Sequence, residues 1–137
     1  MITAIDTNIL LDIFGADPKF GNASAEALRQ CMREGAVHAC EAVWVETGVF
    51  FPNEHDYLHA MKSLNIEFSS ITQKTAFEAA KTWRVYRSAG GKRERIVADF
   101  LIGAHAMTQC QRLLTRDKGF YRRYFNLTIL DPSLEAG

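Results

Sequence analysis

The sequence predicts an α/β protein, a three-layer α/β/α sandwich in which helices cover both faces of a short, mainly parallel central sheet. Short apolar runs that suit buried strands alternate with longer segments whose apolar residues recur at helical spacing. This alternation favours a parallel sheet, because parallel neighbours are joined by crossover helices. The chain has 137 residues, 47% of them hydrophobic, so we expect a single domain over residues 1–137 with its own core.

The first dozen residues predict a strand, a turn and a helix. Residues 1–5 are mostly apolar, which suits a strand buried on both faces. Asp6 follows, and apolar residues then recur at helical spacing over 9–14, with Thr7 or Asn8 available as caps. Open α/β sheets bind their ligands at such strand ends. Asp6 is therefore either a simple helix cap or part of a ligand site.

The other elements follow in a regular order along the chain. We expect a helix that begins near Asn22 or Ser24 and ends at Gly35, a strand over 36–40, helices over 42–51 and 55–64, a strand over 66–71, helices over 72–88 and 96–109, and strands at 113–114 and 128–130. Glycines and prolines punctuate the links between them.

Composition narrows the classes of function. Sixteen basic and sixteen acidic residues cancel, so nucleic-acid binding would need separate charged patches. Cys31, Cys40 and Cys110 are widely spaced, which predicts neither a disulfide framework nor a zinc site and fits a reducing cytoplasm. The sequence shows no secretory leader and no apolar run near the roughly 20 residues that cross a bilayer. We expect a cytoplasmic protein without membrane contact.

Four acidic residues stand where an ionised carboxylate is unfavourable. Glu46 and Asp99 interrupt apolar predicted helices, whereas Asp6 and Asp117 follow closely on predicted strands. Such carboxylates need a base, a raised pKa or a metal, and Arg95 is the only basic residue one helical turn from Glu46 or Asp99. If the two strands are neighbours, the four acids meet, and oxygen ligands of this kind select Mg²⁺ or Mn²⁺.

Each of these acids also has an ordinary structural interpretation. Asp117 can be a turn residue before Gly119, and Glu46 and Asp99 can lie at solvent-facing helix borders. Together, acids at two strand ends and in two apolar helices favour a shared cation. Asp12 falls on a different helical face from Asp6, and we expect it to be solvated.

These motifs together resemble a known family. D-T-N-I-L-L-D from Asp6, the acid in the apolar helix, A-D-F-L-I-G-A-H-A from Ala98 and T-R-D-K-G-F from Thr115 resemble the PIN domain, particularly the small VapC-type toxins of type II toxin–antitoxin systems. The resemblance covers nearly the whole chain. It implies an endoribonuclease that forms a homodimer and is blocked by an antitoxin. Some relatives carry a further acid near the position of Gly119, which this chain lacks.

The same resemblance assigns roles to individual residues. It implies that Mg²⁺ or Mn²⁺ is bound by the carboxylates of Asp6, Glu46, Asp99 and Asp117, with support from Asn8 and Thr115. We expect Asp6 and Asp99 to be direct ligands. RNA phosphodiester bonds would then be hydrolysed by a metal-activated water, with no Ser, His or Cys nucleophile.

Basic residues gather at 92–95 and around Asp117. The second cluster contains the predicted substrate contacts Arg116, Lys118, Arg122 and Arg123, interleaved with Phe120, Tyr121 and Tyr124. Such a segment suits contact with an RNA backbone and stacking on unpaired bases. It can also be a solvated charged turn packed on its aromatic residues.

Two other classes of function stay open. A metal-dependent phosphatase or phosphoacceptor domain also places Asp at a strand end, but it would want a second Asp where Asn8 stands. A non-catalytic RNA- or partner-binding module could keep the fold, although all four acids are present. The segment around Glu46 carries more apolar side chain than one thin helix can bury, at Val45, Val49, Phe50 and Phe51. We therefore expect part of it to contact a second subunit or a partner.

Overall fold

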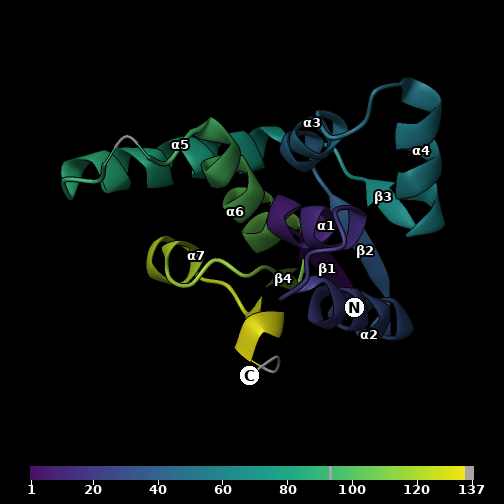
Figure 1. Cartoon of the computed structure of the whole chain (residues 1–137). Helices are drawn as coiled ribbons and strands as arrows, with labels where there is room; N and C mark the ends of the chain where they lie inside the picture. Colours follow the sequence, from purple (N-terminus) through teal and green to yellow (C-terminus); the bar gives the residue numbers. More distant parts are fainter. Residues whose placement is uncertain (93, 135–137) are drawn as a thin grey trace.

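A five-stranded parallel sheet forms the centre of the computed structural model, which describes residues 1–92 and 94–134 (Figure 1). Its strands are β1 (Ile2–Ile5), β2 (Ala36–Ala39), β3 (Ile66–Phe68), β4 (Arg112–Leu114) and β5 (Ile129–Leu130), in the spatial order β3-β2-β1-β4-β5. Every pairing in the sheet is parallel. The predicted α/β/α fold is confirmed.

Helices connect the strands and cover both faces of the sheet. They are α1 (Thr7–Phe14), α2 (Gly21–Glu34), α3 (Glu41–Gly48), α4 (Glu54–Ser63), α5 (Gln73–Ser88), α6 (Val97–Gln109) and α7 (Phe120–Tyr124), and a 3₁₀ turn, η1 (Pro132–Leu134), follows β5. Helix α2 packs against β2, whereas α6 packs against β1 and β4. Figure 1 shows α2 and α6 on opposite sides of the strands.

The core lies between β1, β4 and α6. Ala4, Ile5, Leu113 and Leu114 are at most 1% exposed, as expected of strands covered on both faces. A Cβ atom at Gly103 of α6 would lie 2.4 Å from the Phe125 ring, so only glycine allows this close approach. Helix α6 therefore lies close against Phe125, while the pairing of β1 with β4 places these two strands side by side.

Helix α7 was not predicted, and it changes the interpretation of the basic segment. Phe120 and Tyr121 are 6% and 1% exposed, and the Phe120 ring meets those of Tyr86 and Phe100 edge to face. The prediction that Phe120 and Tyr121 offer stacking surfaces to RNA bases is therefore wrong. Hydrophobic burial holds the apolar side of this short helix and leaves its cations outside.

Two smaller features complete the description. Helix α3 ends at Gly48 rather than at Phe51. In the part of the chain that the structure describes, no helix is both long and apolar enough to cross a membrane.

Candidate metal-binding site

The site lies at the carboxyl ends of β1 and β4. These strands are neighbours, with Ile5 opposite Leu114, and the Asp6 N–H donates to the Leu114 carbonyl at 3.0 Å. The sheet grows toward β2 on one side of β1 and toward β4 on the other, so strand order reverses here. This is the crevice where open α/β sheets bind ligands.

Asp6 is buried and held by three donors. It is 7% exposed, and its carboxylate accepts hydrogen bonds from the Thr7 N–H at 2.7 Å, the Thr115 hydroxyl at 2.7 Å and the Asn8 amide at 3.4 Å. Burial raises the pKa of Asp6 to about 6, and the charges of Asp99 and Glu46 act in the same direction. Asn8 and Thr115 thus contact the acid that they were expected to support.

Glu46 reaches the same region from α3. Its carboxylate accepts a hydrogen bond from the Thr7 hydroxyl at 2.8 Å, and Thr7 is itself 7% exposed. Sequence reasoning treated Thr7 only as a possible cap. Its position between Asp6 and Asn8 in the opening motif was the available signal for a second role, which is to tie Glu46 to the start of α1.

Asp99 and Asp117 lie together near one cation. Asp99 accepts from the Ile96 N–H at 3.0 Å in the first turn of α6, and burial raises its pKa. Asp117 accepts from the Gly119 and Phe120 N–H groups at 3.2 and 2.9 Å. The Arg95 guanidinium lies 2.8 Å from Asp117 and 4.0 Å from Asp99, so Arg95 bridges both acids.

The charges of three of the acids act on the buried phenol of Tyr121. It is 1% exposed, and burial followed by the charges of Asp6, Asp99 and Asp117 raises the pKa of its phenol. The burial of Tyr121 was missed from the sequence, because Tyr121 was grouped with aromatic residues expected to be exposed.

The donor set fits a hard divalent cation. Four carboxylates contribute oxygen atoms, and Arg95 is their one cationic contact among the described residues, which leaves an excess of negative charge of the kind that Mg²⁺ or Mn²⁺ balances. Within residues 1–92 and 94–134, no three Asp, Glu, His or Cys side chains yet converge closely enough to share one ion. Binding would therefore require side-chain movement at the acids.

Asp12 and Arg116 form an internal ion pair that was not expected from the sequence. Asp12 was expected to be solvated but is 4% exposed. The Arg116 Nε and Nη2 atoms donate to its carboxylate at 2.6 and 2.8 Å, and the Ser24 hydroxyl donates at 2.7 Å. The Arg116 guanidinium also lies 4.1 Å from the centre of the Phe20 ring. Arg116, predicted as a substrate contact, is engaged in an internal ion pair.

The other predicted substrate contacts have different surroundings. Lys118, Arg122 and Arg123 are all exposed. Lys118 directly follows Asp117, and Arg122 and Arg123 belong to α7. Arg93, in the middle of the first basic cluster, lies outside the described residues.

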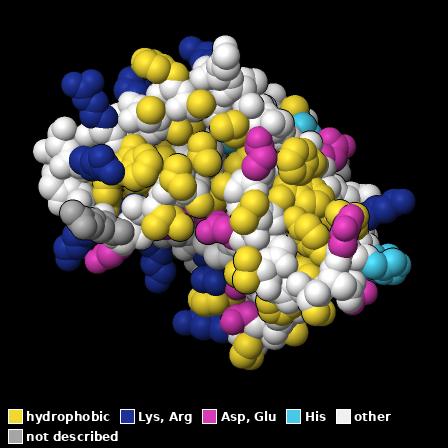
Figure 2. Space-filling view, turned by 90° about the horizontal axis from the view of Figure 1, so that it is seen from above, with side chains coloured by type: hydrophobic (Ala, Val, Ile, Leu, Met, Phe, Trp, Pro, Cys, Tyr) yellow, Lys and Arg dark blue, Asp and Glu magenta, His cyan; other side chains and the backbone are white. Residues whose placement is uncertain are grey.

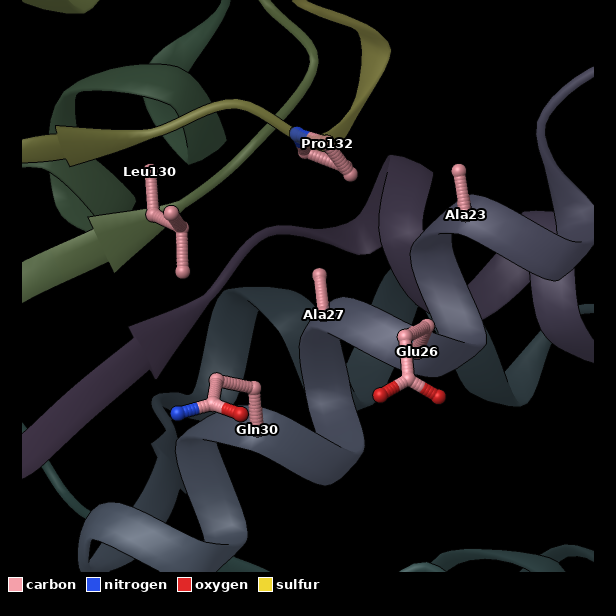
Figure 3. Close-up of a pocket in the computed structure, with 6 residues that line it drawn as sticks. All are labelled: Ala23, Glu26, Ala27, Gln30, Leu130 and Pro132. Atoms are coloured by element: carbon pink, nitrogen blue, oxygen red, sulfur yellow. The ribbon is translucent and has the colours of Figure 1, made fainter. Parts of the chain in front are cut away.

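A hollow away from the acids lies between α2 and the C-terminal segment (Figure 3). It measures about 420 Å³, and Figure 3 shows the residues around it: Ala23, Glu26, Ala27, Gln30, Leu130 and Pro132. Glu26, the one acid among these six, is paired with Arg29 and Arg33. The predicted site residues all lie elsewhere.

Comparisons with known proteins agree with this architecture. The family model of the PIN domain matches residues 3–126. No curated protein matches the chain. Solved structures with a similar fold include VapBC2 from Rickettsia felis bound to a DNA fragment from its promoter, at 17% identity and a TM-score of 0.76, covering 96% of this chain and 98% of that chain.

Two further solved structures are similar over the same extent. VapBC-1 from nontypeable Haemophilus influenzae is 20% identical with a TM-score of 0.76, covering 97% of this chain and 99% of that chain. DNA-bound VapBC from Salmonella typhimurium is 13% identical with a TM-score of 0.75, covering 96% and 98%. At these identities the similarity shows a shared fold.

Proposed function

The chain belongs to the PIN-domain family, and from this premise we propose that it is a Mg²⁺- or Mn²⁺-dependent endoribonuclease, the VapC-type toxin of a toxin–antitoxin pair. One observation carries the proposal: four acidic side chains lie where strand order reverses, Asp6 and Glu46 both bound by Thr7 and Asp99 and Asp117 both next to Arg95. A purely structural cluster would be expected to contain enough cations to balance its acids.

The chain's own groups orient the carboxylates. Asp6 and Asp99 would hold the cation directly, and Glu46 and Asp117 would complete the oxygen set. Hydroxyl and backbone donors hold all four of these acids before any ligand arrives, which limits the reorganisation that binding requires. A divalent cation held there supplies charge relief at the phosphate oxygens and activation of the attacking water.

The exposed cations beside the site suit the substrate. Lys118, Arg122 and Arg123 are exposed, and cations in such positions neutralise the phosphates of RNA. We do not include Arg116 among the substrate contacts, because its guanidinium is held by Asp12.

An antitoxin and a second copy of the chain are the proposed protein partners. The similar solved structures are VapBC complexes. On this chain, Val45, Val49 and Phe50 are 68%, 84% and 50% exposed. Figure 2 shows hydrophobic side chains gathered on the face that carries α3 and α5. An apolar surface of this kind is typical of proteins that bind a partner.

The test is cleavage of end-labelled structured RNA by the purified, antitoxin-free protein. We expect discrete fragments with Mg²⁺ or Mn²⁺ and none with EDTA. The variant Asp99→Asn should be inactive, whereas Glu54→Gln, at an exposed acid of α4, should cut as the parent does.

Two outcomes would count against parts of this proposal. Equal cutting by Asp99→Asn and the parent would mean that the activity comes from a contaminant or from another site. If no RNA is cut but Mn²⁺ raises the melting temperature of the parent and not of Asp99→Asn, the metal site stands and ribonuclease activity does not.

A further inference from the structure

A hollow of about 690 Å³ opens beside the acidic site, between α5 and the residues that lead into α6. Its lining includes Trp83, Arg87, Lys92, Arg95 and Ile96. The volume lies within the range of roughly 300 to 1,000 Å³ that is usual for small-ligand sites. The hollow is therefore large enough for one nucleotide.

Two lining residues connect this hollow directly to the acids. Arg95 lines it and also pairs with Asp117 at 2.8 Å. Ile96 lines it and donates its N–H to Asp99 at 3.0 Å. If one phosphate of an RNA strand lies at the acids, the next nucleotide of that strand can enter this hollow.

The charge of the hollow is opposite to that of the acidic site. Arg87, Lys92 and Arg95 line it, and the described lining residues include no acid. Arg87 and Lys92 are exposed and take part in no ion pair among the described residues. Cations that are not neutralised by an acid within the fold are available to a phosphate group.

One wall offers a stacking surface. The Arg87 guanidinium lies 4.8 Å from the centre of the Trp83 ring, and that ring is stacked on Phe100 at 5.2 Å with an interplanar angle of 12°. Unpaired bases stack on aromatic rings and on arginine guanidinium planes. The Arg87 guanidinium, supported by Trp83, therefore offers a plane for the flat face of a nucleobase.

The rim of the hollow is fixed by the fold. The Tyr86 hydroxyl donates to the Lys92 carbonyl at 2.6 Å, and a Cβ atom at Gly91 would lie 2.4 Å from the Tyr86 ring. The turn at Gly91 and Lys92 therefore lies closely against Tyr86, and the Lys92 backbone is positioned before a ligand binds.

We propose that this hollow binds one unpaired nucleotide of the RNA substrate, next to the phosphate that lies at the acids. The base stacks on the guanidinium plane of Arg87, which itself lies over Trp83, and Lys92 and the N–H edge of Arg87 contact its phosphates. The inference rests on the proposed function and specifies its substrate, which must be single-stranded at this nucleotide.

Binding without cleavage tests the inference. In the full chain carrying Asp99→Asn, the affinity for a fluorescently labelled single-stranded RNA of about ten nucleotides is measured by anisotropy in EDTA at several salt concentrations. The double substitution Arg87→Gln with Lys92→Gln is compared with Arg84→Gln with Lys74→Gln. The second pair removes the same charge from exposed positions of α5 that lie outside the lining.

We expect the first pair to weaken binding by about tenfold or more, and to lower the slope of log affinity against log salt by about 1.4, because each phosphate contact with a single strand contributes about 0.7. The second pair should change affinity by no more than about twofold, since exposed charges away from the contact are screened. Binding of a blunt-ended RNA duplex, in which every nucleotide is paired, should differ little between the two pairs. Thermal melting establishes that all variants are folded.

Equal losses for the two pairs would overturn the inference, because only general charge would then matter. A loss that is equally large for the blunt-ended duplex would overturn it as well. If parent protein with Mn²⁺ cuts RNA but the Arg87 and Lys92 variants bind and cut like the control pair, the hollow is excluded and the nuclease stands. If the parent cuts no RNA but the expected binding differences appear, the hollow stands and the nuclease does not.

Discussion

Asp6 and Asp12 are two buried aspartates at one short helix, and their surroundings differ in one respect. They are 7% and 4% exposed. Asp12 receives two N–H groups from Arg116 and a hydroxyl from Ser24. Asp6 receives only uncharged donors and lies near the charges of Asp99 and Glu46, and burial raises its pKa to about 6.

The difference separates two uses of a buried acid. Arg116 neutralises Asp12 inside the fold, so this pair fastens the segment after β4 to α1 and has no charge left for a ligand. Asp6 has no such partner among the described residues, so its ionised form remains costly until a cation is supplied from outside. Asp12 is therefore expected to serve stability and Asp6 to serve function.

The largest expected effect comes from Asp6→Asn. We predict that cleavage falls by at least about a thousandfold, more than the roughly 10- to 100-fold lost with a residue that only supports a metal ligand. The stability of the fold should be unchanged or higher. Single-turnover cleavage with Mg²⁺ measures the effect, and Asp12→Asn, corrected for its folded fraction, is the matched control. If Asp12→Asn were as inactive as Asp6→Asn when fully folded, the two aspartates would not differ in role.

Arg116→Met should act on stability instead. Breaking a buried ion pair by removing one partner leaves an uncompensated charge, and we expect a loss of about 3 kcal/mol in the free energy of unfolding. Urea denaturation measures it, with Arg122→Met as the control at an exposed cation. Unchanged stability together with weakened RNA binding would instead return Arg116 to the substrate contacts.

The pH dependence of stability sharpens the comparison further. Because the pKa of Asp6 is about 6 in the folded chain and ordinarily 3.8, the folded state takes up this proton first as the pH falls. The destabilisation by Asp6 is therefore present above pH 6 and decreases below it, by up to about 1.4 kcal/mol for each pH unit.

This destabilisation is absent in Asp6→Asn. In EDTA, that variant should be more stable than the parent at pH 7.5, and the advantage should shrink by about 2 kcal/mol on going to pH 4.5. Urea titrations of both proteins at a series of pH values provide the measurement. A constant difference between them would mean that Asp6 titrates normally.

The location of Asp6 and Asp117 could be predicted from the sequence, because parallel strands bring their carboxyl ends to one edge of the sheet. The partner of Asp12 could not, since Arg116 lies 104 positions away and nothing in the sequence around either residue points to the other. Helix α7 was missed for a related reason. Its cations dominate the local pattern, and the burial of Phe120 depends on contacts with Tyr86 and Phe100 from other helices.

Arg95 gives the smallest expected effect and connects the two kinds of acid. It pairs with Asp117 at 2.8 Å while its guanidinium lies 4.4 Å from the centre of the Phe120 ring, so Asp117 is partly neutralised inside the fold, as Asp12 is. A cation that binds Asp117 must compete with this contact.

We therefore expect Arg95→Gln to bind Mn²⁺ about fivefold more tightly, the factor that corresponds to about 1 kcal/mol of charge repulsion removed. Calorimetric titration of the RNA-free protein measures it, with Arg84→Gln as the control for net charge. Weaker Mn²⁺ binding by Arg95→Gln would show instead that Arg95 holds Asp117 in the orientation that the metal needs. Asp117 would then serve metal binding, as Asp6 does, and would not be neutralised inside the fold as Asp12 is.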